Sequence, residues 1–304
     1  TPLLLEWYGP HVAFGVPGVL MGLATIVFWI GRNKFVHIPA GGSEFIRESF
    51  SGEGLRAVFQ LIPLYLFISV FWALYDQTAS AWVLQAENMD RRWAFGGQSG
   101  EWHASQIQAV NPILVLALIP LFSYVIYPAM NRVVKLTPLK KIGLGFFVTA
   151  LAFSMSGWIE TQLQPLDALA AKSAAEREVK VAEVVSEQVT AGLRPHIGWQ
   201  VLAYLVLTCA EVMVSITALE FSYTQAPNRM KSLIMSLYLL SVTLGNLLTS
   251  VVNQLIQNGD GTTWLPGASY YWFFTVLQLV TAVLFIGVAA AFREKSYIQE
   301  SAPA

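Results

Sequence analysis

Seven long apolar runs constrain the fold of this 304-residue chain more than any other feature. Each run approaches or exceeds the roughly 20 residues that a helix needs to cross about 30 Å of hydrocarbon. A helix also satisfies its own backbone hydrogen bonds, which a bilayer demands. We therefore predict an all-α membrane protein with seven transmembrane helices. The predicted spans are residues 12–30, 57–75, 107–127, 142–159, 198–219, 234–256 and 270–292.

Composition supports a membrane protein over a soluble one. Hydrophobic residues make up 55% of the chain and charged residues 12%, and the mean hydropathy is +0.53. These values exceed what a soluble core of this length requires. The net charge of -1 indicates no nucleic-acid partner. The single cysteine, Cys209, lies in an apolar run, so we expect a packed thiol and no intrachain disulfide.

Basic residues set the predicted orientation, because cytoplasmic loops retain Lys and Arg during insertion. Most of them fall in alternate loops, which include Arg32, Lys141 and Arg293. We therefore place these loops in the cytoplasm. An odd number of spans then puts Thr1 outside and Ala304 inside. We expect a multi-pass protein of a bacterial inner (plasma) membrane.

Two acids lie in or beside apolar runs that contain no basic residue. Glu211 is near the middle of the run at 199–219, and Asp76 follows the run at 61–74. A carboxylate in hydrocarbon costs roughly 2.5 to 3.5 kcal/mol on insertion scales, so such residues face a protein interior or a water-filled path. Two such acids suggest proton-coupled transport.

Polar and aromatic side chains accompany both acids at helical spacing. Trp72 lies four residues before Asp76 and shares its helical face, which suits a cavity wall. Asp76 either pairs with a basic group on another helix and releases it when protonated, or forms a fixed structural ion pair. Tyr204 and Ser215 fall on one stripe with Glu211.

The Glu211 stripe predicts an inward-facing helix surface. An ionised Glu211 could bind a ligand ammonium group, whereas the protonated form would not, so proton binding and ligand binding would be linked. An inert hydrogen bond between helices is the alternative. Gln108 and Asn111, three residues apart, could present amides to the same cavity. Capping of a helix by Asn111 just before Pro112 is the alternative there.

The segments between the spans also carry predictions. Residues 90–106 read as an outer loop, in which Trp93 and Trp102 suit the interfacial aromatic belt. Residues 33–55 read as a cytoplasmic linker. Residues 166–189 read as an outer helix or helical hairpin that is either a solvated spacer or an interaction surface.

Five short motifs recur in order along the chain and identify a family. They are Phe-Trp-Ala-Leu-Tyr-Asp-Gln at 71–77, Asn-Pro at 111–112, Glu-Phe-Ser-Tyr at 220–223, Gln-Ala-Pro at 225–227 and Met-Lys-Ser at 230–232. Together they closely resemble the proton-dependent oligopeptide transporter family of the major facilitator superfamily. The likeness runs from about residue 14 to residue 292.

This resemblance implies a major facilitator-type helical bundle and a division of the chain. Residues 1–32 would be the last transmembrane helix of an N-terminal bundle, and residues 33–55 a cytoplasmic linker. Residues 56–304 would form the C-terminal six-helix bundle, with an extracellular helical insert at about 164–194. The family's Glu-x-x-Glu-Arg-Phe motif belongs to a first helix that is not in this sequence. We expect the chain to be the C-terminal portion of a longer protein and not to transport alone.

The resemblance also implies roles for single residues. Glu211 matches the glutamate that receives the peptide amino terminus, and Asn111 an asparagine that helps to hold the same end. Gln108 matches a neighbouring pocket amide, Trp72 a tryptophan that lines the pocket, and Asp76 an acid in the extracellular gate.

Five further positions complete the predicted site. Tyr204 matches a tyrosine near the site, and Ser215 belongs to the same stripe. Tyr238 stands where many members carry a pocket tryptophan, so that pocket would be larger or more polar. Glu220 would have a packing or inner-gate role near the cytoplasmic end, with Lys231 or another base.

The function implied by the resemblance is proton-coupled symport of di- and tripeptides by alternating access, by a monomer in a lipid bilayer with no cofactor and no metal. A related symporter for nitrate or a modified amino acid is the alternative. A seven-helix retinal protein is disfavoured because residues 270–292 contain no lysine. An intramembrane enzyme is disfavoured because the sequence has no His-Glu-x-x-His, no Gly-x-Ser-x-Gly and no Cys-based pair.

Overall fold

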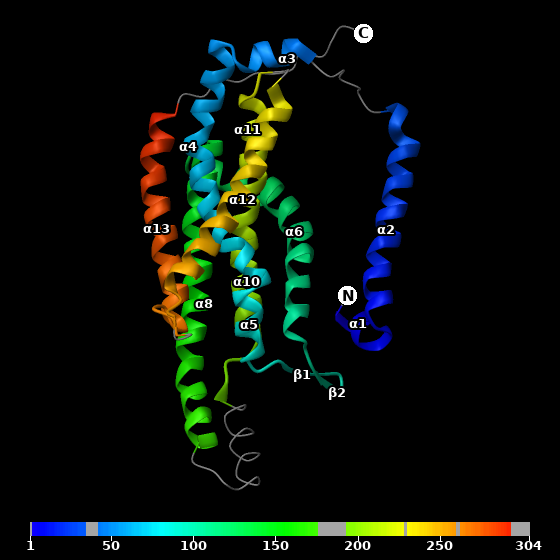
Figure 1. The fold of residues 1–304 in the computed structure, drawn as a ribbon, viewed down its shortest axis with the longest axis vertical. Helices are drawn as coiled ribbons and strands as arrows, with labels where there is room; N and C mark the ends of the chain where they lie inside the picture. The colour runs from blue at the N-terminus through cyan, green and yellow to red at the C-terminus, as the bar shows by residue number, and fades with distance from the viewer. Residues whose placement is uncertain (1, 35–41, 176–192, 228–229, 260–261, 293–304) are drawn as a thin grey trace. The chain divides into compact units, whose positions relative to one another are not determined.

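The computed structural model describes residues 2–34, 42–175, 193–227, 230–259 and 262–292, and nearly all of its regular structure is helical (Figure 1). The chain divides into two compact units, Thr1–Arg47 and Glu48–Ala304. The predominance of helices confirms the prediction of an all-α membrane fold.

In the described part of the chain, seven helices are long and apolar enough to cross a membrane, and each lies on one of the seven predicted runs. They are Pro10–Lys34, Gly54–Glu87, Ala104–Asn131, Pro138–Gln164, Gly198–Gln225, Lys231–Ile256 and Ala268–Ala291. Most extend beyond the predicted ends. The helical backbone continues into polar residues, where hydropathy no longer marks it.

In the first unit, the helices α1 (Pro2–Tyr8) and α2 (Pro10–Gly31) are separated by a glycine. Helix α1 ends before Gly9, whose φ of 77° is open to glycine, and α2 begins with a proline at its first position. A 3₁₀ turn, Arg32–Lys34, follows α2.

The predicted linker at 33–55 contains a short helix that the sequence analysis did not foresee. This helix, α3, covers Gly42–Ser49. Helix α4 (Gly52–Tyr75) begins two residues after Phe50, with the Ser51 hydroxyl accepting a hydrogen bond from the Gly54 amide at 3.0 Å. The linker therefore ends in a capped helix start.

The second unit is a bundle of long helices with short turns at their ends. After α4 come η2 (Asp76–Ala79), α5 (Ala81–Glu87), β1 (Arg92–Phe95), β2 (Gln98–Glu101), η3 (Ala104–Ala109), α6 (Val110–Leu121), η4 (Phe122–Ile126) and α7 (Tyr127–Asn131). The chain continues through α8 (Pro138–Ala175), α10 (Gly198–Glu211), η5 (Val212–Ile216), α11 (Thr217–Gln225), α12 (Lys231–Ile256) and α13 (Ala268–Ala291). The segments η4 and η5 are π-helical turns.

Two glycines allow neighbouring helices to approach closely. A Cβ added at Gly145 of α8 would lie 2.5 Å from the Val214 side chain in η5. One added at Gly245 of α12 would lie 2.5 Å from the Ser69 carbonyl oxygen in α4. Small residues at such crossings are typical of membrane helix packing.

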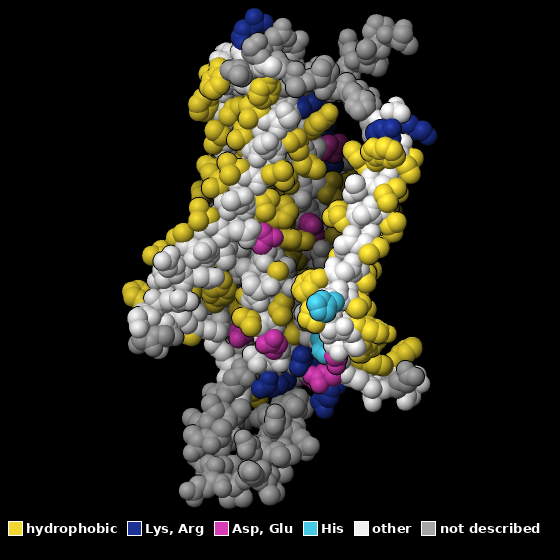
Figure 2. All heavy atoms as spheres, turned by 45° about the vertical axis from the view of Figure 1, so that its right-hand side comes forward, with side chains coloured by type: hydrophobic (Ala, Val, Ile, Leu, Met, Phe, Trp, Pro, Cys, Tyr) yellow, Lys and Arg dark blue, Asp and Glu magenta, His cyan; other side chains and the backbone are white. Residues whose placement is uncertain are grey.

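Aromatic side chains fill the interior of the bundle. Phe146 of α8 and Phe285 of α13 are fully buried and meet edge to face, with ring centroids 5.0 Å apart. At the end of the bundle that carries α5, the buried Trp82 packs against Phe153 and Tyr204. In Figure 2 hydrophobic side chains cover much of the visible surface of the bundle, as expected for a surface that meets lipid.

The predicted outer loop at 90–106 contains a β-hairpin instead of irregular chain. Strands β1 and β2 pair antiparallel, and Gly96 and Gly97, with φ of 60° and 80°, make the turn between them. Trp93 lies opposite Gly100, where a Cβ would come within 2.9 Å of the indole. Trp102 packs on Trp93 with ring centroids 6.1 Å apart.

Helix α8 continues past its membrane-length segment to Ala175. The first part of the predicted outer insert at about 164–194 is therefore helical. Residues 176–192, which hold most of the predicted helix or hairpin at 166–189, lie outside the described residues.

Candidate functional site

A cluster of polar side chains joins three helices around Glu211, the last residue of α10. The Asn111 side-chain amide of α6 donates to the Glu211 carboxylate at 2.9 Å and to the Thr208 hydroxyl at 3.1 Å. The Tyr75 hydroxyl, at the end of α4, donates to the Asn111 side-chain oxygen at 3.2 Å. The Asn111 amide thus connects α4, α6 and α10 through side chains alone.

The position of Asn111 excludes one of the two interpretations of its role, the capping of a helix start. The residue lies inside α6, one residue after the helix begins, and its side chain points to α10. It does not cap the helix ahead of Pro112. Glu211 remains partly exposed, and no described Lys or Arg forms an ion pair with it.

The helix changes geometry directly after Glu211. Residues Val212–Ile216 form a π-helical turn, and a second π turn, Phe122–Ile126, interrupts the neighbouring helix α6. Turns of this kind occur frequently at functional sites because they displace side chains from regular helical positions. The side chains of Phe122 and Val212 pack in the same small cluster.

An aromatic wall lies beside this cluster. Trp72 meets Tyr75 edge to face, with centroids 5.3 Å apart, and its indole nitrogen is buried without a hydrogen-bond partner among the described residues. The Tyr238 hydroxyl lies 3.2 Å from both the Ser215 hydroxyl and the Ser215 carbonyl oxygen. Ser215 itself belongs to the π turn, so this wall is linked to the segment after Glu211.

Asp76 directly follows Tyr75 and is the first residue of η2. Its partner is neutral, since the Asn246 side-chain amide of α12 donates to the carboxylate at 2.6 Å. The basic partner considered from the sequence is not found among the described residues of this chain. The contact joins η2 to α12 one residue after Gly245, where α12 lies close against α4.

Gln108 and Tyr204 converge on one backbone carbonyl. The Gln108 side-chain amide donates to the Thr78 carbonyl oxygen at 3.2 Å, and the Tyr204 hydroxyl donates to the same atom at 3.1 Å. Tyr204 is 2% exposed and packs on Trp82. The structure therefore gives both side chains a partner in η2, apart from the Glu211 contacts.

Glu220 and Lys231, both of which the structure describes, form no ion pair with each other. Glu220 lines a cavity of about 310 Å³ together with Tyr127 and Lys141. The Lys231 ammonium group lies 4.0 Å from the centre of the Tyr223 ring, and the Lys141 ammonium lies 4.0 Å from the Tyr127 ring. Lys141 is thus the base on the Glu220 cavity.

The sequence analysis missed three partners of the predicted site: Tyr75, Thr208 and Asn246. Each is a polar side chain inside a long apolar run, at helical spacing from a predicted site residue or across a helix contact. Tyr75 and Thr208 lie within three residues of Trp72 and Glu211, so the same spacing argument would have found them. Nothing in the sequence pairs Asn246 with Asp76.

Among the described residues, no group of three or more His, Cys, Asp and Glu side chains could hold a metal ion. Charged side chains pair beside the β-hairpin instead. Two Arg92 guanidinium nitrogens donate to the Asp90 carboxylate at 2.8 Å each. These hydrogen bonds hold the pKa of Asp90 below its ordinary value.

The membrane-length helices and the likeness to two solved structures place the chain in a class, that of major facilitator-type membrane transporters. Two solved structures share the fold. An auto-inhibited POT family peptide transporter matches with 26% identity and a TM-score of 0.69, covering 99% of this chain and 68% of its own. The POT family transporter PepTSo matches with 28% identity and a TM-score of 0.69, covering 96% and 67%.

The family follows from the sequence comparisons. The POT family profile, PTR2, matches residues 1–52 and 49–273. The chain belongs to the POT family, as the motifs predicted.

Curated relatives match over part of their length. Peptide transporter family 1 of Drosophila melanogaster is 32% identical over 186 residues, which is 50% of this chain and 24% of the relative. Peptide transporter 3 of Caenorhabditis elegans is 30% identical over 188 residues, or 50% and 26%. Protein NRT1/PTR family 8.1 of Arabidopsis thaliana is 26% identical over 261 residues, or 81% and 43%. The chain spans less than half the length of these relatives.

Proposed function

We propose that this chain forms part of a symporter that imports di- and tripeptides together with protons by alternating access. The observation that carries the proposal is the Glu211–Asn111 contact at 2.9 Å, set inside a POT-family bundle. Membership of a family whose relatives include named peptide transporters supports the substrate class.

The amino terminus of the peptide would bind at Glu211. An ionised carboxylate attracts an ammonium group, and its protonated form does not. Asn111 holds one carboxylate oxygen, which orients the other toward a ligand. Binding of a proton and binding of the peptide at this carboxylate would therefore oppose each other. Symport then requires the proton to enter on another group of the full-length protein and to reach Glu211 only when the peptide is released.

The remaining predicted residues take supporting roles in this proposal. Trp72 and Tyr238 would contact the peptide side chains, with Ser215 holding the Tyr238 hydroxyl. Asp76 would act in the outer gate, where an arginine or lysine from another bundle would replace or join Asn246 as its partner. Gln108 and Tyr204 would hold η2, which begins with Asp76, in place.

The site would be completed by further helices. Residues 1–32 would be the last helix of an N-terminal bundle, residues 33–55 the linker and residues 56–304 the C-terminal bundle. Substrate sites in transporters of this kind lie between two such repeats, near the middle of the bilayer. We place the protein as a monomer in a bacterial inner membrane, with the end at residue 304 in the cytoplasm.

The test uses the full-length protein in liposomes with an acidic exterior and labelled dialanine. We expect concentrative uptake that a protonophore abolishes and that unlabelled di- and tripeptides compete. Free alanine should not compete. Concentrative uptake that persists without a pH gradient would contradict proton coupling. Competition by nitrate but not by peptides would assign the chain to a relative that carries another solute.

A further inference from the structure

The Tyr75 hydroxyl lies at Asn111 and Glu211, the side chains predicted to hold the peptide amino terminus. It donates to the Asn111 side-chain oxygen at 3.2 Å, and it also interacts with the Glu211 carboxylate. Tyr75 is half-buried and is the last residue of α4. A hydroxyl of the protein itself therefore occupies the place where the ligand ammonium group would bind.

The orientation of the Asn111 side chain is fixed by its neighbours. The Thr208 hydroxyl donates its own hydrogen to the Tyr204 carbonyl oxygen at 2.7 Å, so it can only accept from the Asn111 amide. The second amide hydrogen of Asn111 goes to Glu211. With both N–H groups used, the Asn111 oxygen faces Tyr75 and is the atom left to accept from a ligand.

An ammonium group and the Tyr75 hydroxyl compete for these oxygens. An ammonium group has three donors and no acceptor, so it needs several acceptors close together. Asn111 and Glu211 provide them, and no described Lys or Arg pairs with Glu211 to take the same place. A charge-assisted hydrogen bond is roughly twice as strong as a neutral one. A bound ammonium group would therefore displace the hydroxyl.

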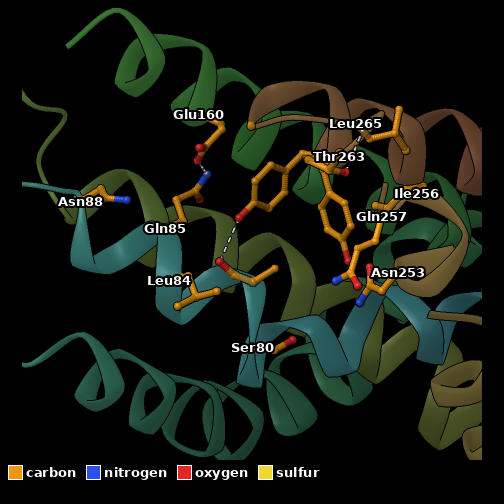
Figure 3. A pocket seen from close by; sticks show the side chains of 14 residues that line it. Ser80, Leu84, Gln85, Asn88, Glu160, Asn253, Ile256, Gln257, Thr263 and Leu265 are labelled. Atoms are coloured by element: carbon orange, nitrogen blue, oxygen red, sulfur yellow. Dashed lines mark hydrogen bonds between the residues drawn. The ribbon is translucent and has the colours of Figure 1, made fainter. Parts of the chain in front are cut away.

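The chain beyond Tyr75 is anchored in η2 and at the start of α5. The Thr78 carbonyl oxygen accepts the two side-chain hydrogen bonds described above. The Ala81 carbonyl oxygen accepts a third, from the Tyr271 hydroxyl of α13 at 2.9 Å. Figure 3 shows Ser80, the residue before Ala81, at the cavity that this part of the chain lines. Displacement of the tyrosine side chain would therefore be taken up at the junction of α4 and η2, where Asp76 lies.

We propose that Tyr75 is a positioning residue whose hydroxyl occupies the ammonium position in the empty protein and is displaced by the peptide. This displacement frees the start of η2, so that peptide binding is transmitted to Asp76 at the outer gate. The inference rests on the proposed function, because it takes Glu211 as the site of the ligand ammonium group and Asp76 as a gate residue.

Binding of dialanine to the full-length protein, measured by calorimetry, tests the displacement. Tyr75→Phe removes the hydroxyl and keeps the ring beside Phe71 and Trp72. We expect the Kd for dialanine to fall roughly two- to tenfold, because a hydrogen bond that competes with the ligand is lost. The Kd for N-acetyl dialanine, which has no ammonium group, should stay unchanged. Tyr204→Phe is the matched control, since its hydroxyl donates to the Thr78 carbonyl oxygen instead, and it should leave both Kd values unchanged.

Uptake of dialanine into liposomes tests the link to the gate. Tyr75→Phe should lower the KM for dialanine and also lower the maximal rate several-fold, because peptide binding no longer acts on Asp76. An unchanged maximal rate would overturn that link.

The remaining outcomes separate this inference from the proposed function. Tyr75→Leu provides a second variant without the hydroxyl if Tyr75→Phe lowers the melting temperature, and it should also bind dialanine more tightly. An equal or weaker affinity without the hydroxyl, or a gain of the same size for N-acetyl dialanine, would overturn the inference while the proposed function stands. A wild-type protein that binds no dialanine would contradict the proposed function itself.

Discussion

The side chains of Asn111 and Glu211, 100 residues apart in the chain, are joined by a hydrogen bond of 2.9 Å. The bond connects α6 to α10 at the point where α10 becomes a π-helical turn. Asn111 also accepts a hydrogen bond from the Tyr75 hydroxyl at the end of α4. The Glu211 carboxylate is therefore positioned by side chains of α6 and α4. A ligand that binds Glu211 would therefore affect the contacts among α4, α6 and α10.

Asp76→Asn should separate proton coupling from peptide exchange. The variant keeps the size of the side chain and removes its charge, and Asn246 can still bond the remaining oxygen. We expect proton-driven accumulation of dialanine in liposomes to fall several-fold, with exchange between equal peptide pools largely preserved. Equal retention of both activities would remove Asp76 from the gate.

Gly245→Ala should force α12 away from α4. The new Cβ would lie 2.5 Å from the Ser69 carbonyl oxygen and 2.7 Å from the Ala73 amide nitrogen, and neither backbone atom can move alone. Overpacking of this kind costs about 1–3 kcal/mol, so the melting temperature of the full-length protein should fall. Gly287→Ala on α13 is the matched control, because no atom lies within 4 Å of its added Cβ. Equal melting temperatures for the two variants would contradict the close crossing.

Tyr204→Phe tests whether this side chain supports the structure or contacts the ligand. The variant removes the hydroxyl that donates to the Thr78 carbonyl oxygen and keeps the ring on Trp82. We expect the free energy of unfolding to fall by about 0.5–1.5 kcal/mol and the affinity for dialanine to stay unchanged. Weaker peptide binding at an unchanged melting temperature would instead assign Tyr204 to the ligand.

Asp90→Asn should leave the pH profile of uptake unchanged between pH 5 and 7. Hydrogen bonds from Arg92 lower the pKa of Asp90 in the folded protein. The pair therefore stabilises the fold fully above the pKa of an unfolded Asp, about 3.9, and this stabilisation is lost as the pH falls through the lower pKa of the folded state. The carboxylate therefore stays ionised throughout this range. A profile that shifts in the variant would show that Asp90 takes up a proton during transport.

The sequence predicted the spans because hydrocarbon demands long apolar helices, and this demand leaves a direct trace in composition. It predicted the span ends less well, since the helices continue into residues that face the interface. The hairpin within 90–106 was missed although Gly96 and Gly97 are a recognised turn pair. Helical spacing grouped Glu211 with Tyr204 and Ser215, whereas the structure joins Glu211 to Asn111 of α6 and gives Tyr204 and Ser215 the partners Thr78 and Tyr238.

Partners across helices were beyond the reach of sequence spacing. Asp76 and Asn246 are 170 residues apart, and only the packing of α4 on α12 brings them together. Lys141, and not Lys231, lines the cavity beside Glu220 for the same reason, because α8 and α11 are close in space but far apart in sequence. The π turns leave no mark in the apolar pattern.

The assignment of the peptide amino terminus to Glu211 is tested most directly by acid-driven uptake of labelled dialanine into liposomes that contain the full-length protein with Glu211→Gln. Glu87→Gln, which changes the same charge on the exposed face of α5, serves as the reference. We predict that Glu211→Gln lowers uptake roughly tenfold or more, because a neutral amide cannot replace the carboxylate opposite an ammonium group. Uptake equal to that of Glu87→Gln would contradict the account.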